Sequence, residues 1–147
     1  MGLYELVRQR CWLIVICDAE EDVNTTFEGI GLSVAKCRTD FGVKIELDLR
    51  PLQPDPVSKL SKAHFVVGHI HYPAPPGSDP ADRKYTGTLI YLKTTLCGYE
   101  PADILHYKRE HEDFPQQSMA NRWFTETQFE SYRRLGELIG EEAAAAF

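Results

Sequence analysis

The sequence predicts an α/β fold, a mixed sheet of about four to five strands with flanking helices. Three observations lead to this prediction. Residues 11–17 form a continuous apolar run of strand length, and residues 43–49 alternate strictly between apolar and charged side chains. Between these two segments, apolar residues recur every three or four positions from Phe27 to Phe41, which indicates an amphipathic helix. Strand, helix and strand therefore follow one another in the order of a βαβ-like unit.

The first elements come from residues 2–17. Gly2 to Arg10 carries its leucines and valine at helical spacing, which predicts a short N-terminal helix. No polar residue interrupts the run at 11–17, and such a run is typical of a strand covered on both faces by helices. Residues 18–22 follow as an acidic loop.

The next helix and strand have clear boundaries in the sequence. Thr25 and Glu28 have the spacing of a capping box, which predicts that the helix begins there, and Gly42 ends it. In the strand at 43–49 only one face is apolar, so the other face is expected to contact water.

The second half of the chain adds two strands and two helices. Prolines separate residues 50–57 from predicted strands at 63–72 and 86–93, which form a hairpin or neighbouring strands. Pro101 fits the first turn of a short helix. Thr125 and Gln128 open a final helix, whose end at 141–147 is expected to fray.

Composition predicts one domain over residues 1–147, because 43% hydrophobic residues in a chain of 147 suffice for a single core. A net charge of −6 argues against a nucleic-acid-binding surface, which would need a basic stripe. No apolar run reaches the roughly 20 residues of a membrane span. The four cysteines form no C-x-x-C pair, and free thiols favour a reducing, cytoplasmic setting.

His69 and His71 are candidate metal ligands, because residues two apart on a strand share one face. A closed site needs a third or fourth ligand, and His64 alternates to the opposite face. His106, His111 and Asp18 complete the set only if the tertiary fold brings them together. Hydrogen-bonded structural or surface histidines are the favoured interpretation, so we predict neither a bound metal nor a cofactor.

Asp18 is the other candidate ligand-binding residue, because it ends a buried strand and ligands collect at the carboxyl ends of strands in open α/β sheets. The alternative is a carboxylate that accepts backbone N–H groups of the following loop. No catalytic residue is predicted. None of the serines stands in G-x-S-x-G, and Ser33 falls inside the predicted helix at 25–41.

Seven segments form a series that extends over nearly the whole chain. They are Gly2-Leu-Tyr-Glu-Leu with Arg8-Gln-Arg-Cys11, Ile14-Val-Ile-Cys-Asp-Ala19, Lys36-Cys-Arg-Thr-Asp-Phe-Gly42 with Ile45-Glu-Leu-Asp48, Gly68-His-Ile-His-Tyr-Pro73, Gly87-Thr-Leu-Ile-Tyr-Leu-Lys93, Gly98-Tyr-Glu-Pro-Ala-Asp103 and Gln128-Phe-Glu-Ser-Tyr-Arg-Arg-Leu-Gly136. In order and spacing the series resembles the carboxy-terminal part of bacterial patatin-like phospholipases. One departure is Met119-Ala-Asn-Arg122, where such proteins usually read Thr-Ala-Asp-Gln.

The resemblance implies a lipid acyl hydrolase with a Ser–Asp dyad and a glycine-rich oxyanion hole. In that family the serine elbow and an Asp-Gly-Gly/Ala motif lie upstream of the segment that matches Gly2-Leu-Tyr. The chain is therefore expected to be a C-terminal portion of a patatin-like protein, structural and catalytically inactive alone.

Its expected partners are the N-terminal catalytic part of the same protein and a second copy of the chain, which would cover apolar surface of the strand at 11–17. A lipid or membrane surface is expected only through the parent protein. The alternative function is a small ligand- or metal-binding module that uses Asp18 and the face of His69 and His71.

Overall fold

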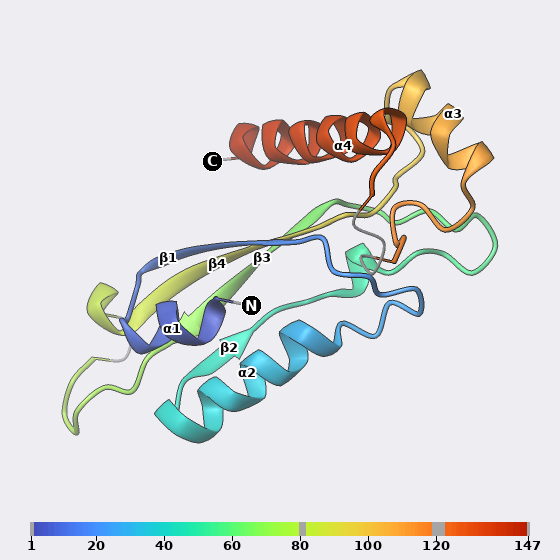
Figure 1. Ribbon diagram of the computed structural model, residues 1–147. Coiled ribbons are helices and arrows are strands. Elements are labelled where there is room, and N and C mark those ends of the chain that lie inside the picture. Colours follow the sequence, from blue (N-terminus) through green and yellow to red (C-terminus); the bar gives the residue numbers. More distant parts are fainter. Residues whose placement is uncertain (1, 80–81, 119–122, 147) are drawn as a thin grey trace. The chain divides into compact units, whose positions relative to one another are not determined.

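The computed structural model describes residues 2–79, 82–118 and 123–146. It has the predicted class, a four-stranded mixed sheet with flanking helices (Figure 1). The helices are α1 (Leu3–Arg8), α2 (Glu28–Phe41), α3 (Ala102–Glu110) and α4 (Glu126–Ala145), and the strands are β1 (Leu13–Asp18), β2 (Lys44–Glu46), β3 (Phe65–His71) and β4 (Thr86–Lys93).

The described residues belong to two compact units. The first unit comprises residues 1–17, 26–49 and 66–91, and the second comprises 18–25, 50–65 and 92–147. The single domain expected over residues 1–147 stays a prediction. None of the helices within the described ranges is long and apolar enough to cross a membrane.

The sheet has the strand order β1-β4-β3-β2. β2 pairs antiparallel with β3, so that Ile45 lies opposite Ile70. β1 and β4 run parallel, because the N–H of Thr88 donates to the carbonyl of Trp12 and, six residues further along both strands, the N–H of Thr94 donates to the carbonyl of Asp18. The two strands expected at 63–72 and 86–93 are therefore neighbours, as the sequence indicated.

The prediction that the first strand is covered on both faces is wrong. Ile14 and Ile16 of β1 are buried, whereas Leu13 and Val15 are 43% and 50% exposed. Successive side chains of a strand point to opposite faces, and the burial of β1 alternates in the same way. Only the side of β1 that carries Ile14 and Ile16 has other side chains packed on it.

The capping box expected for α2 is also wrong. The helix begins at Glu28, and its N-cap is Phe27, which has a φ of 54° and makes no side-chain cap hydrogen bond. Thr25 has a φ of 50° and lies two positions before the N-cap, in left-handed backbone, whereas a capping threonine takes extended backbone. The other end agrees with the prediction, since Gly42 ends α2 in left-handed backbone with a φ of 65°.

In the second unit, α3 packs against α4, and three aromatic rings pack together. Phe114 is fully buried, with the rings of Tyr107 and Tyr132 edge-on to it at centroid distances of 5.1 and 4.9 Å. The N-cap of α4 is as predicted, because the Thr125 hydroxyl accepts the N–H of Gln128 at 3.2 Å. The helix continues to Ala145, further than the expected onset of fraying at 141.

Candidate functional site

The two histidines singled out in the sequence lie on the exposed face of β3, in the first unit. His71 Nε2 is 3.4 Å from Glu46 Oε2, and Glu46 also lies opposite His69 in the β2–β3 register. Lys44 and, more weakly, His71 lower the pKa of Glu46 by hydrogen bonding to its carboxylate. Neither histidine belongs to a group of three metal-ligand side chains among the described residues.

His69 also lines a cavity of about 790 Å³ in the first unit, together with Arg10, Arg83 and Lys84. The charges of this basic cavity suit an anion better than a metal ion. Two of the three basic side chains already have partners, because Arg10 donates to the carbonyl of Pro73 and Lys84 pairs with Asp82.

Asp18 belongs to the second unit and has a buried partner. Its Oδ2 lies 3.4 Å from Lys93 Nζ, and the two side chains are only 7% and 2% exposed. Asp18 Oδ1 accepts the N–H of Glu20 at 2.9 Å, which is the turn role considered above as the alternative, and Lys93 donates to the carbonyl of Glu20 at 2.8 Å. The carboxylate and the ammonium therefore hold the 18–25 segment in place.

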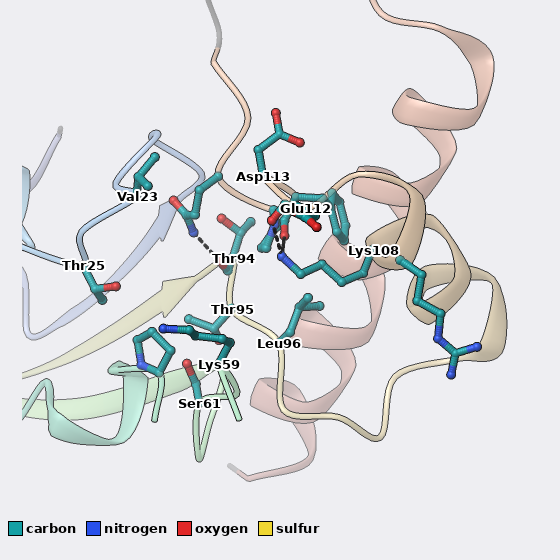
Figure 2. Close-up of a pocket in the computed structure, with 15 residues that line it drawn as sticks. Val23, Thr25, Lys59, Ser61, Thr94, Thr95, Leu96, Lys108, Glu112 and Asp113 are labelled. Atoms are coloured by element: carbon teal, nitrogen blue, oxygen red, sulfur yellow. Dashed lines mark hydrogen bonds between the residues drawn. The ribbon is translucent and has the colours of Figure 1, made fainter. Parts of the chain in front are cut away.

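A cavity of about 650 Å³ lies within the second unit, lined by residues of segments 23–25, 54–61, 94–96 and 108–116 (Figure 2). Lys108 donates to the carbonyls of Glu112 and Phe114, both at 2.6 Å, and burial lowers the pKa of its ammonium. The Thr94 hydroxyl is buried and lacks a hydrogen-bond partner among the residues described. The cavity has polar groups at its wall and no serine paired with a base, because Ser61 donates to the carbonyl of Leu52.

A third arrangement in the second unit joins His64, Cys97 and Glu100. Each offers one ligand atom, and these atoms lie within 4.8 Å of one another. His64 immediately precedes β3, and the other two belong to the turn between β4 and α3. The His64 and Glu100 side chains are fully buried, and burial raises the pKa of the Cys97 thiol to about 11.

The turn that carries Cys97 and Glu100 is closed by its own backbone. The Glu100 carboxylate accepts the N–H groups of Cys97 and Gly98. Gly98 has a φ of 93°, and a Cβ there would lie 2.7 Å from Leu60 Cδ1, so the turn requires glycine. The turn thereby places the ligand atoms of Cys97 and Glu100 near the His64 ring.

Sequence reasoning missed this cluster. The alternation of side chains correctly placed His64 on the face away from His69. Nothing local in the sequence connects His64 to a turn 33 positions later. The one available signal was the spacing Cys97-Gly-Tyr-Glu100, which fits two ligands on a turn, although a search for C-x-x-C passes over it.

Three of the described serines donate their hydroxyl protons to backbone carbonyls. The hydroxyls of Ser33, Ser61 and Ser131 donate to the carbonyls of Gly29, Leu52 and Thr127, each at 2.8 Å. A hydroxyl whose proton is held by a carbonyl is not activated by a base.

Comparison of the chain with protein-family models, curated proteins and solved structures returned no match.

Proposed function

We propose that the chain is the non-catalytic C-terminal segment of a patatin-like lipid acyl hydrolase and supports the catalytic part of the same protein. The observation that carries the proposal is the outer face of β1. Leu13, Val15 and Cys17 alternate onto one side of this end strand and are exposed, and Trp12 beside them is 73% exposed. An uncharged apolar face on an end strand is the kind of surface that another part of a protein covers.

The occupant proposed for this face is the catalytic part of the same polypeptide. The segments that resemble patatin-like phospholipases include Ile14-Val-Ile-Cys-Asp-Ala19, and in that family the dyad and oxyanion hole lie in the preceding part. Acyl transfer needs a nucleophile, a base within hydrogen-bond reach and donors for the developing oxyanion. The hydroxyls of Ser33, Ser61 and Ser131 point to backbone carbonyls, which supports a structural role for this segment.

Activity of the isolated chain is the first test. We expect no turnover of p-nitrophenyl butyrate or of fluorescent phospholipids above background, and no labelling by a fluorophosphonate probe. Removing even part of a nucleophile, base and oxyanion set lowers rates by roughly 10³ or more. Stoichiometric labelling of one serine, with turnover lost when that serine is changed to alanine, would contradict the proposal.

Association is the second test, and the chain offers a matched control. The reading frame that encodes the chain is extended upstream, where we expect Gly-x-Ser-x-Gly and Asp-Gly-Gly in frame, and the upstream part is co-expressed with the chain. Val15→Glu on β1 should reduce co-purification, whereas Val57→Glu, at a residue 91% exposed in the second unit, should not. An upstream frame without either motif, or equal co-purification of both variants, would contradict the proposal.

Without its partner, the chain is expected to cover the same face by self-association. Light scattering coupled to size-exclusion chromatography should show a dimer or larger species at tens of micromolar, and Val15→Glu should shift it toward the monomer. A clean monomer of the unmodified chain would show that this face needs no cover.

A further inference from the structure

His64 is a buried imidazole whose two nitrogens have different surroundings. Its Nδ1 lies 3.2 Å from the Thr95 hydroxyl oxygen. The Thr95 hydroxyl donates its own proton to the carbonyl of Ala63 at 3.0 Å, so its oxygen accepts the proton of Nδ1. Nδ1 therefore carries a proton, and in the neutral imidazole Nε2 then carries a lone pair.

That lone pair points at other electron-rich atoms. His64 Nε2 is fully buried without a hydrogen-bond partner in the described part of the chain. It faces Glu100 Oε1 at 3.6 Å and Glu142 Oε2 at 3.9 Å. Glu100 Oε1 accepts the N–H of Cys97 and Glu142 Oε2 accepts the hydroxyl of Tyr99, whereas the lone pair of His64 Nε2 has no such donor, so a positive centre between the three atoms would stabilise it.

The distances favour a metal ion over a shared proton as that centre. A direct N–H···O bond spans 2.7–3.2 Å, which is shorter than both measured separations. Two ligand atoms of one tetrahedral Zn²⁺, each about 2.1 Å from the ion, lie about 3.4 Å apart. The ligand atoms of His64, Cys97 and Glu100 lie within 4.8 Å of one another, a spacing that closes by about 1 Å when the ligands converge on an ion.

We propose that the second unit binds one Zn²⁺ through His64 Nε2, Cys97 Sγ, Glu100 Oε1 and Glu142 Oε2. One imidazole, one thiolate and two carboxylates give the four N, S and O ligands of a closed tetrahedral zinc site. The Cys97 thiol releases its proton to solvent when its sulfur binds the ion. The site is independent of the acyl hydrolase proposal, since the four ligands belong to the second unit and none lies on β1.

The surroundings of the four ligands resemble those of known metal sites in one respect: partners outside the ligand set hold the ligands in orientation. Thr95 holds the His64 ring, and the N–H groups of Cys97 and Gly98 hold the Glu100 carboxylate. The Tyr99 hydroxyl donates to Glu142 Oε2 at 3.2 Å, and the Tyr99 ring lies edge-on to His64. The ion would join the entry to β3, the turn after β4 and α4, and is expected to stabilise the second unit.

The test uses the full chain, stripped with a chelator and then titrated with Zn²⁺ alone against a competing chromophoric chelator. We expect one equivalent of Zn²⁺ per chain and a higher melting temperature in its presence. Co²⁺ in place of Zn²⁺ should give a thiolate-to-metal charge-transfer band that depends on Cys97. Absence of zinc binding by the unmodified chain would overturn the proposal.

Variants separate this site from adventitious binding. Cys97→Ala and Glu142→Gln should each weaken Zn²⁺ binding at least ~100-fold, and Glu142 is partly exposed, so its replacement leaves the fold intact. Matched controls are Cys17→Ala and His71→Gln, which change an exposed cysteine and an exposed histidine of the first unit and should bind as the unmodified chain does. Equal zinc affinity in Cys97→Ala, Glu142→Gln and the two controls would indicate an adventitious ion only and overturn the proposal.

Discussion

The two compact units differ in what they bury. Within the described ranges, every buried polar or charged side chain belongs to the second unit, and the buried side chains of the first unit are apolar or aromatic. The five buried polar residues are Ser61, His64, Lys93, Thr95 and Glu100. The first unit is therefore expected to depend on close packing, and the second on the pairing of polar groups.

This contrast determines which substitutions each unit tolerates. An apolar core loses stability when side-chain volume is added or removed, and the loss grows with the change in volume. A buried charge responds to the loss of its partner, because the remaining charge is then desolvated without compensation. The predictions below compare the two kinds of sensitivity.

The largest effect is expected from the buried ion pair of the second unit. Lys93→Met leaves the Asp18 carboxylate buried without its ammonium partner and should lower the free energy of unfolding by about 4 kcal/mol. Urea unfolding measures the loss. Adding Asp18→Asn removes the uncompensated charge and should restore most of the stability, and a double variant as unstable as Lys93→Met would contradict the account.

In the first unit the corresponding test is steric. A Cβ at Gly68 would lie 2.6 Å from the carbonyl oxygen of Glu46 and 2.8 Å from Leu47 Cδ1, so Gly68→Ala should lower the free energy of unfolding by about 3 kcal/mol. The control is Gly31→Ala in α2, where no atom lies within 4 Å of the added Cβ. That variant should be more stable by up to about 1 kcal/mol, because alanine favours a helix over glycine. Equal effects of the two substitutions would show that packing at Gly68 is not limiting.

Tyr72 gives the first unit a dependence on alkaline pH. Burial raises its pKa to about 12, and its hydroxyl donates to the carbonyl of Cys11 at 2.6 Å. Because this pKa lies above the unfolded value of about 10, the protonated Tyr72 side chain stabilises the folded state fully below pH ~10, and this stabilisation is lost as the pH rises toward ~12. Relative to Tyr72→Phe, the unmodified chain should lose ~2 kcal/mol of stability over this interval. Parallel pH profiles of the two proteins would contradict this expectation.

The smallest effect is expected at the exposed histidines of β3. His69→Gln and His71→Gln should each change stability by only ~0.5 kcal/mol, since both side chains contact solvent. Chemical unfolding at neutral pH measures this change. A loss of several kcal/mol, or the loss of a bound metal, would indicate that these two histidines are metal ligands after all.

The sequence predicted the fold where local pattern and environment agree. Residues 86–93 were expected as a strand and form β4 with those bounds, and Thr125 caps α4 as its spacing indicated. The pattern failed where neighbours decide the outcome. The run at 11–17 is apolar throughout, but the face of β1 that carries Leu13 and Val15 is exposed, because packing on a face depends on tertiary neighbours that no local pattern reveals.

The cluster around His64 was not predicted from the sequence for a related reason. His69 and His71 attracted attention because their spacing is visible in the sequence, whereas the cluster around His64 draws on three separated segments. A ligand set of this kind becomes visible only when a turn such as 97–100 and a helix such as α4 are placed in space. The feature that identifies the cluster is the buried Nε2 of His64, which has no hydrogen-bond partner among the residues that the structure describes, and burial is a tertiary property.

The composition of β1 also affects the tendency of the isolated chain to form fibrils in solution. Residues 12–17 carry no charge and no proline, and consist of large apolar or β-branched side chains with one cysteine, which is the composition of segments that stack into cross-β fibrils. Arg10 on one side and Asp18 on the other act as charged gatekeepers that disfavour such stacking. Conditions that screen or neutralise these two charges are therefore the ones in which fibril growth from the isolated chain should be fastest.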